Sequence, residues 1–395
     1  MNKRERLEKM IGPVVANALK QGHSDLFISP GMVHARVAGR VVPIDPDTPV
    51  NYDPNTLRDL ALMLLEEGAD YLIERPGASV RNDRLAPEPQ GLFDDVGDLR
   101  TRPDQVRHEH RFSSAEDVLD ARGSVDLAYN FEAARVRLKI YKAGGDVHIA
   151  MRLIPKEPGT FTQLLLPEAE LQTLPAAGSG LFLVTGPTGS GKSTTLASLL
   201  TYISKVMPAM VVTIEDPVEY IIPSYRARVI QREIGRDTPS YEFALEDALR
   251  QNPDVIMIGE IRNRETLYAA LRLAASGHLV LTSYHAGDVE QAVARIVNSF
   301  PADDRAEVAN LLSSVLVGIL AQKLLPRADE TGRVLAYEYL AANAAARNHI
   351  REGAYPQLRN VQGMVPFHRT VDMLYQQKLI SPAIYKAHSR HSTAS

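Results

Sequence analysis

The chain contains no cysteine among its 395 residues. That absence excludes disulfide bonds, thiolate zinc sites and thiol redox chemistry, so the sequence suits a reducing compartment. There is also no uninterrupted apolar run of about 18 residues, the length that a membrane-spanning helix needs. The basic stretch MNKRERLEKMIGPVV at the N-terminus lacks the apolar core of a signal peptide. We therefore expect a cytoplasmic protein whose membrane association is peripheral and comes through partners.

Basic charge is not in excess either. Lysine and arginine number 44 against 48 aspartates and glutamates, which gives a net charge of −4. No global basic field is present to recruit nucleic acid or an anionic bilayer, so we expect no stable direct binding of nucleic acid. The length suggests two or three domains, and a hydrophobic content of 45% is enough for ordinary cores.

The first part of the chain predicts a smaller mixed α/β domain over residues 1–153, since helical and strand-like patterns alternate there. The helical patterns are Leu7–Leu19 and Asn55–Glu67, and the strand-like ones are Asp25–Ser29, His34–Ala38, Arg40–Ile44, Ser124–Tyr129, Ala134–Tyr141 and Val147–Leu153. Residues of about 76–111 are rich in Pro, Asp and Arg and predict a long exposed insertion. Residues 154–167, which begin IPKEPGT, predict an interdomain linker.

Four apolar runs rich in β-branched residues follow the linker, with helical patterns between them. The runs are Leu181–Thr185, Val211–Ile214, Val255–Ile258 and Leu279–Thr282, and the helical patterns lie near Ser193–Lys205, Tyr241–Gln251 and Arg264–Ala275. Such alternation predicts an α/β core, residues 168–300, with a parallel sheet that helices cover on both faces. From residue 301 to 395 the pattern predicts a helical C-terminal region.

The stretch GPTGSGKST fits the phosphate-binding template G-x-x-x-x-G-K-[ST], and it lies between a predicted strand and a predicted helix, as that motif requires. It predicts that ATP binds to Gly186, Pro187, Thr188, Gly189, Ser190, Gly191, Lys192, Ser193 and Thr194. The glycines let backbone N–H groups face the phosphates at a helix N-terminus. Lys192 then reaches the β- and γ-phosphates, and Ser193 ligates Mg²⁺. The alternative is a glycine-rich turn without a ligand.

Carboxylates follow two of the other predicted strands, at the sheet edge where ligands of open α/β folds bind. Glu260 comes after Val255–Ile258 and is our candidate for the catalytic base, with a further contact to Mg²⁺ through water. Glu215 follows the strand before it and is the candidate for positioning water or Mg²⁺. The structural alternatives are a helix cap for Glu260 and a turn residue before Pro217 for Glu215.

Two histidines, His278 and His285, flank the fourth predicted strand. A single histidine is more often a hydrogen-bonded structural residue than a sensor of the γ-phosphate, so the residues alone leave both roles open.

Several motifs together resemble the secretion ATPase superfamily, which drives type II secretion, type IV pili and type IV secretion. TIEDPVEY (213–220), NPDVIMIGEIRNRET (252–266) and GHLVLTSYHAGD (277–288) resemble its Asp box, Walker B and His box, in the family's order. HSDLFISPG (23–31) and AGRVVPI (38–44) look like its N-terminal signature. QREIGRDTPSYEFALEDALRQNPD (231–254) and AARNHIREG (345–353) are similar to pilus retraction motors.

The resemblance implies a RecA-like ATPase domain after a PAS-like N-terminal domain. It also implies a homo-hexamer that docks on platform proteins at the cytoplasmic face of the inner membrane, and it makes His278 and His285 active-site residues. Secretion ATPases present arginines from an N-terminal strand across the interdomain cleft to the γ-phosphate, and Arg135 and Arg137 match those positions. Strand periodicity puts both on the face opposite Val136 and Leu138, and the alternative for that face is a solvated basic surface.

Three departures from the family pattern bear on which machine the chain serves. Ala275 stands where retraction motors carry a glutamate, SYHA (283–286) replaces Thr-Leu-His-Thr, and the four-cysteine module of extension motors is absent. The sequence is closest to retraction motors and to the Dot/Icm and conjugation ATPases, and it does not separate them. A RecA-like nucleic-acid translocase and a nucleotide-gated assembly module with little turnover are the alternatives from other classes.

Overall fold

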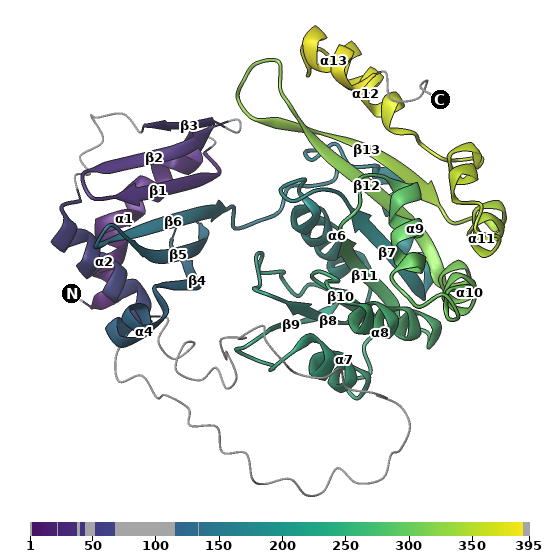
Figure 1. The fold of residues 1–395 in the computed structure, drawn as a ribbon, viewed down its shortest axis with the longest axis horizontal. Coiled ribbons are helices and arrows are strands. Elements are labelled where there is room, and N and C mark those ends of the chain that lie inside the picture. The colour runs from purple at the N-terminus through teal and green to yellow at the C-terminus, as the bar shows by residue number, and fades with distance from the viewer. Residues whose placement is uncertain are drawn as a thin grey trace, which may run out of the picture.

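The structure, a computed structural model, describes residues 2–21, 23–37, 40–43, 52–67, 115–132 and 134–389. Its helices and strands form two lobes that a linker connects (Figure 1). A six-stranded sheet organises the N-terminal lobe and a seven-stranded sheet the C-terminal one. The insertion predicted at about 76–111 lies outside the described residues. No helix in the described part of the chain is long and apolar enough to cross a membrane.

The N-terminal lobe contains the predicted helices and strands in the predicted order, and it has a further helix over Ala115–Arg122 that was not predicted. Its elements are α1 (Lys3–Lys20), β1 (Asp25–Ser29), β2 (Met32–Val37), β3 (Arg40–Pro43), α2 (Pro54–Glu67), α4 (Ala115–Arg122), β4 (Ser124–Asn130), β5 (Arg135–Ala143) and β6 (Asp146–Ile154). The sheet order is β3-β2-β1-β6-β5-β4, antiparallel throughout. Successive side chains alternate between faces, so Val136, Leu138 and Ile140 enter the core beneath α1 and α2, as predicted.

The opposite face of this sheet carries a row of charged side chains. Arg36, Asp25, Arg152 and Arg137 stand opposite one another on β2, β1, β6 and β5. Directly opposed residues share a face of the sheet, so the three arginines and the aspartate project to the same side. The Asp25 carboxylate lies 3.6 Å from Arg36 Nε and 3.3 Å from Arg152 Nε.

The C-terminal lobe contains the predicted parallel sheet with helices on both faces. Its strands are β7 (Gly180–Thr185), β8 (Met210–Glu215), β9 (Arg228–Glu233), β10 (Val255–Ile258), β11 (Leu279–Tyr284), β12 (Leu316–Pro326) and β13 (Arg333–Ala341), in the order β13-β12-β7-β11-β10-β8-β9. Every neighbouring pair is parallel except β12 and β13.

Helices connect these strands and bury both faces of the sheet. They are α5 (Glu168–Leu171), α6 (Lys192–Val206), α7 (Tyr241–Leu249), α8 (Arg264–Ala275), α9 (Val289–Asn298) and α10 (Arg305–Val315), with a 3₁₀ turn at Leu174–Ala177. Two neighbouring residues of β7 show that both faces are covered. Leu181 packs among α8, α9 and α10 on one face, and Phe182 packs against α6 on the other. Strands buried on both faces read as continuous apolar runs, which is why the four central strands were predictable.

The prediction of a purely helical region from 301 to 395 was wrong over residues 316–341. After α10 the chain forms β12 and β13, which extend the sheet beyond residue 300. The run LVGILAQKLLP in β12 is apolar on both faces, and periodicity does not distinguish such a strand from a buried helix. The edge strand β9, RVIQRE, was not predicted either, because its composition is polar.

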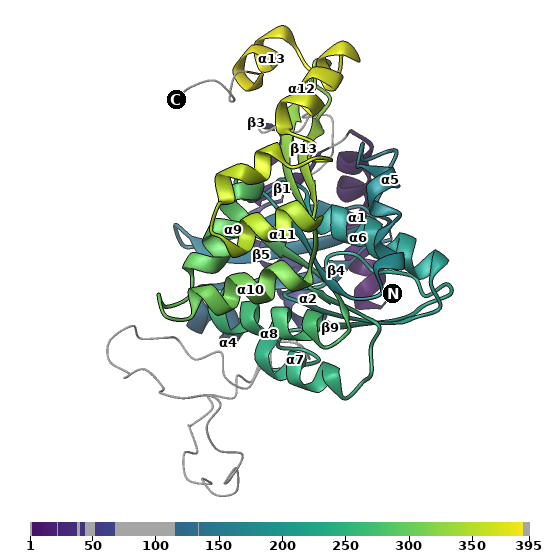
Figure 2. The ribbon, with the colours of Figure 1, turned by 90° about the vertical axis from the view of Figure 1, so that its right-hand side faces the viewer.

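Helices do complete the chain after β13. They are α11 (Ala344–Arg351), a 3₁₀ turn at Tyr355–Asn360, α12 (Phe367–Gln376) and α13 (Pro382–His388). Helix α12 packs beside β13, and α12 and α13 lie at one end of the lobe next to the β12–β13 hairpin (Figures 1 and 2). Thr370 fastens α12 to β13 because its hydroxyl accepts from the Tyr337 N–H and donates to the Tyr337 carbonyl.

Candidate active site

The phosphate loop connects β7 to α6, as predicted. Gly191 precedes the helix with φ +89°, a left-handed conformation that favours glycine. A Cβ on Gly186 would lie 2.3 Å from the carbonyl oxygen of Gln322, so the backbone of β12 leaves no room for a side chain there. The loop is therefore shaped as a cradle of backbone groups at a helix N-terminus, which fits a phosphate.

The ammonium of Lys192 lies at the mouth of this loop. It donates to the carbonyl oxygens of Gly186 at 2.9 Å and Pro187 at 3.2 Å. Burial lowers the pKa of Lys192, while the negative charges of Glu260 and Glu219 oppose that shift. A half-buried cation beside backbone N–H groups fits the β- and γ-phosphates of a nucleotide.

Both lobes line the cleft above this loop, which has a volume of about 830 Å³. Of the predicted nucleotide-binding residues, those in its lining are Thr188, Gly189, Gly191, Lys192, Ser193 and Thr194. Gly186, Pro187 and Ser190 belong to the same loop outside that lining. Ser193 is exposed toward the cleft, where its hydroxyl fits a Mg²⁺ ion that also binds phosphate oxygens.

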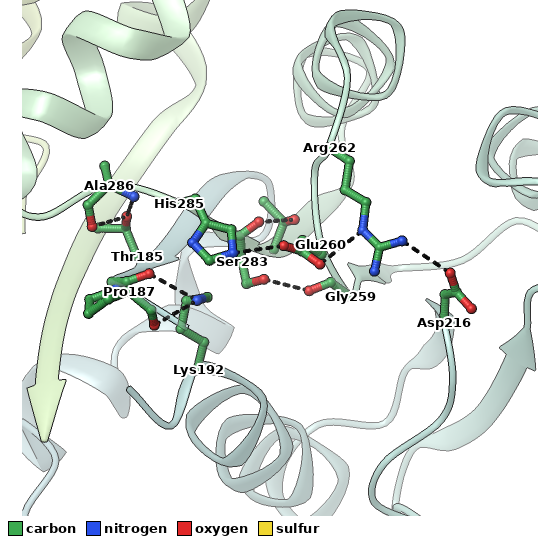
Figure 3. Close-up of polar contacts among 12 residues, drawn as sticks. Thr185, Pro187, Lys192, Asp216, Gly259, Glu260, Arg262, Ser283, His285 and Ala286 are labelled. Carbon is green, nitrogen blue, oxygen red and sulfur yellow. Dashed lines mark hydrogen bonds and ion pairs between the residues drawn. The ribbon is translucent and has the colours of Figure 1, made fainter. Parts of the chain in front are cut away.

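Glu260 lies at the centre of a charged network in the cleft (Figure 3). One carboxylate oxygen is 3.0 Å from His285 Nε2, and the other accepts from Arg262 Nε at 3.1 Å. Arg262 also donates to Asp216 at 3.2 Å. Residues that follow β8, β10 and β11 therefore meet at one edge of the sheet, as predicted from the chain order.

Glu215 lies deeper in the same wall, at the end of β8. Its carboxylate accepts from the Thr213 hydroxyl at 2.7 Å and from the Gln231 amide at 3.0 Å. Burial raises the pKa of Glu215 to about 7, and these hydrogen bonds limit the increase. A carboxyl that titrates near neutrality beside a phosphate loop is suited to exchange a proton with water.

The two predicted histidines lie at opposite ends of β11. His285 follows the strand and lines the cleft, whereas His278 precedes it, and the six residues between them span about 20 Å. The His278 Nδ1 atom lies 3.0 Å from the Ser276 hydroxyl and 3.1 Å from the Leu273 carbonyl oxygen. The structure thus brings His285 to Glu260 and leaves His278 at the other edge of the sheet.

The two predicted arginines of β5 also have different surroundings. Arg137 lines the cleft that Lys192 also lines. Arg135, two residues before it, is buried against the C-terminal lobe, where its Nε donates to the Val218 carbonyl at 2.7 Å and its guanidinium lies 3.5 Å from Glu233. One arginine therefore shares the cleft with the phosphate loop, and the other joins the two lobes.

Sequence reasoning missed several residues of the cleft. Arg36 and Arg152, the row neighbours of Arg137, line it from the N-terminal sheet, and Arg333 lines it from β13. Arg36 and Arg152 are recognised as neighbours of Arg137 only from the pairing register of the strands, which the sequence alone does not give. Arg333 was missed because β13 was expected to be helical.

The fold and the cleft define a RecA-like ATPase with a phosphate loop and a second, arginine-bearing domain. Comparison with known proteins gives the family. Residues 103–394 match the family described as type II/IV secretion system protein, and the chain belongs to that family.

Curated relatives cover most of the chain. It is 36% identical over 310 residues to a twitching motility protein of Neisseria gonorrhoeae, which is 77% of this chain and 81% of that protein. It is 34% identical over 378 residues to the type IV pilus ATPase PilU of Pseudomonas aeruginosa, which is 94% of this chain and 86% of PilU.

Two solved structures resemble this chain over almost its whole length. The pilus retraction motor PilT, crystallised with bound ADP, is 33% identical and matches with a TM-score of 0.74 over 98% of this chain and 97% of its own. The ATPase DotB of Legionella pneumophila is 26% identical, with a TM-score of 0.72 over 95% and 94%. These matches confirm the predicted family, the α/β fold with its RecA-like domain, and the assignment of the chain as an ATPase.

Proposed function

We propose that this chain is a hexameric motor ATPase that powers a type IV pilus, in a retraction-like role, from the cytoplasmic face of the inner membrane. Similar proteins named for twitching motility and for pilus retraction support this assignment. The observation that carries it is the cleft that the phosphate loop and the arginines of the N-terminal sheet line together. The partners we propose are five further copies of the chain and the platform proteins of the pilus.

ATP binds with its phosphates on the loop 186–194. Backbone N–H groups and Lys192 hold the β- and γ-phosphates, and Ser193 and Glu260 would hold the accompanying Mg²⁺. The metal would neutralise part of the phosphate charge. Lys192 is half-buried, which strengthens its contact with the phosphates because less water competes for it.

Glu260 orients the attacking water and accepts its proton. Arg262 and His285 each hold one oxygen of the carboxylate, which fixes its direction. The buried Glu215 positions the water from the neighbouring strand, and its raised pKa lets it share a proton near neutral pH. His278 lies at the far end of β11 from the cleft, so we assign it no role in hydrolysis within its own subunit.

Closure of the N-terminal lobe over the nucleotide couples the reaction to movement. Arg137 approaches the γ-phosphate from β5 and stabilises the charge of the transition state, as arginine fingers do. Loss of the γ-phosphate then removes the partner of Arg137 and releases the lobe as a rigid body. Arg135, which joins β5 to the C-terminal lobe, sets the position from which this movement starts.

A type IV secretion machine is the second candidate. The likeness to DotB favours it, although at 26% identity it is weaker than the likeness to pilus motors. The net charge of −4 argues against a nucleic-acid translocase. The network around Glu260 argues against an assembly module that barely turns over.

Deletion of the gene in its own bacterium tests the pilus assignment. We expect altered numbers of surface pili and lost twitching, both restored by the wild-type chain and by neither Lys192→Ala nor Glu260→Gln. Normal pili together with impaired conjugation or protein export would replace the pilus with a type IV secretion machine.

A further inference from the structure

Gln322, on β12, bridges the phosphate loop and the first turn of α6. Its side chain is only 2% exposed. Its amide nitrogen donates to the carbonyl oxygen of Ser190 at 2.6 Å, and its amide oxygen accepts from the Thr195 hydroxyl at 3.0 Å. A single buried amide thus holds both sides of the loop-to-helix junction.

The register of the sheet explains how Gln322 reaches this position. Ala321 pairs with Thr185, the last residue of β7, so Gln322 is the first residue of β12 beyond the end of its neighbour. There the backbone of β12 runs beside the loop, and its Gln322 carbonyl occupies the space that a Cβ on Gly186 would need. Strand β12 is therefore one wall of the phosphate loop.

The hydrogen bond to Ser190 fixes the orientation of one peptide unit of the loop. In a trans peptide the C=O and the following N–H point in opposite directions, so holding the Ser190 oxygen toward β12 turns the Gly191 N–H away from β12. Gly191 has φ +89°, where a glycine backbone tolerates more than one peptide orientation. A reversed peptide would present an oxygen to the phosphate in place of a donor.

We propose that Gln322 is a positioning residue for nucleotide binding, which keeps the backbone donors of the phosphate loop directed at the β-phosphate. The inference rests on the proposed role of that loop. Arg333 on the neighbouring strand β13 makes a parallel contact, because its Nη1 donates to the Gly189 carbonyl at 3.2 Å. Two adjacent carbonyl oxygens of the loop are thus held from the β12–β13 hairpin.

The β-phosphate is present in both ATP and ADP, so this contact stabilises substrate, transition state and product equally. Losing such uniform binding raises KM and leaves kcat unchanged. A merely structural role predicts the opposite, because a partly unfolded preparation loses kcat in proportion to its active fraction and keeps its KM.

Gln322→Glu tests the proposal. Burial raises the pKa of a carboxyl, so the constants are measured at about pH 9, where the variant side chain is ionised. The carboxylate then has nearly the same shape and still accepts from Thr195, but it does not donate to Ser190. We expect KM for ATP and the dissociation constant of ADP to rise together by about tenfold or more, with kcat within about twofold of wild type. Thermal unfolding without nucleotide measures whether the variant folds.

Arg333→Met gives a second test at an exposed position, where the substitution leaves the core intact. We expect KM for ATP and the dissociation constant of ADP to rise together again, but only by about threefold. Lys323→Gln is the matched control, because Lys323 is adjacent on β12 and its ammonium lies over the Phe367 ring instead of the loop.

Unchanged KM and ADP affinity in folded Gln322→Glu, or a loss of kcat alone, would overturn the proposal. Should Gln322→Glu not fold, unchanged constants in Arg333→Met would overturn it equally. A wild-type chain that binds no ADP would instead refute the proposed function of the loop, and this inference with it.

Discussion

The guanidinium of Arg135 on β5 lies 3.5 Å from the carboxylate of Glu233 on β9, so a strand of the N-terminal lobe is joined to the edge strand of the C-terminal sheet. The segment between β8 and β9 completes the contact, because Val218 accepts from Arg135 through its carbonyl and donates to Glu233 through its N–H. Both charged side chains are buried, with 10% and 5% of their surface exposed. Removing either partner therefore leaves a buried charge without its counterion.

Arg135→Ala and Glu233→Gln should both impair the closure of the N-terminal lobe over the nucleotide. If Arg135 acts by fixing the starting position of the lobe, each variant lowers kcat by about tenfold, and the double variant is no worse than either single one. Steady-state ATP hydrolysis by the three variants checks this. A wild-type rate for Glu233→Gln beside a strongly impaired Arg135→Ala would indicate that Arg135 itself reaches the nucleotide.

Arg137→Ala should act on the chemical step. Loss of a guanidinium that contacts the γ-phosphate in the transition state lowers kcat by about 10³-fold, while ring assembly and ATP affinity change much less. Lys139→Ala is the matched control, since Lys139 is exposed two residues further along the same face. Normal kcat for Arg137→Ala would return this face of β5 to a solvated basic surface.

The raised pKa of Glu215 predicts that the free energy of unfolding depends on pH. Burial raises its pKa to about 7 in the folded chain, so between about pH 4.5 and 7 the folded state binds more protons at this site than the unfolded state. Its contribution to stability therefore falls as the pH rises through that window. Denaturant unfolding at pH 5 and pH 8 should show Glu215→Gln gaining roughly 1 to 3 kcal/mol relative to wild type at the higher pH.

The control for this measurement is Glu246→Gln, on the exposed side of α7. It should show the same difference between pH 5 and pH 8 as wild type. A pH-independent gap between Glu215→Gln and wild type would mean that the Glu215 carboxyl has an ordinary pKa in the folded chain.

DNA should have little effect on the ATPase. With a net charge of −4 the chain offers no general basic surface, so any DNA binding should be weak and steeply salt-dependent. ATP hydrolysis measured at physiological salt with and without single-stranded DNA tests this. A tenfold stimulation would support the translocase.

Much of the fold could be predicted because its strongest patterns are local. The four central strands are continuous apolar runs, and β5 alternates in Val136, Leu138 and Ile140. Strand β12 was mistaken for helix because both faces of an apolar strand are buried, which removes the alternation. Strand β9 was missed because its polar composition hides its place at the edge of the sheet.

The candidate site was predictable as far as chain order determines it. Residues that follow parallel strands meet at one edge, which brought Glu215, Glu260 and His285 together. His278 precedes its strand, and the same rule puts it at the far edge. Arg36 and Arg152 reach the cleft because of the register of the N-terminal sheet. Gln322 reaches the phosphate loop because β12 passes the end of β7. Long-range pairing sets both features.

The sharpest test of the proposed active site compares ATP binding with ATP hydrolysis in Lys192→Ala and Glu260→Gln. We expect Lys192→Ala to lose hydrolysis and to bind ATP weakly, because the phosphates lose their cation. Glu260→Gln should bind ATP about as well as wild type and hydrolyse it at least about 100-fold more slowly, since only the base changes. Near wild-type hydrolysis by Glu260→Gln would contradict the assignment of the base and, with it, the proposed active site.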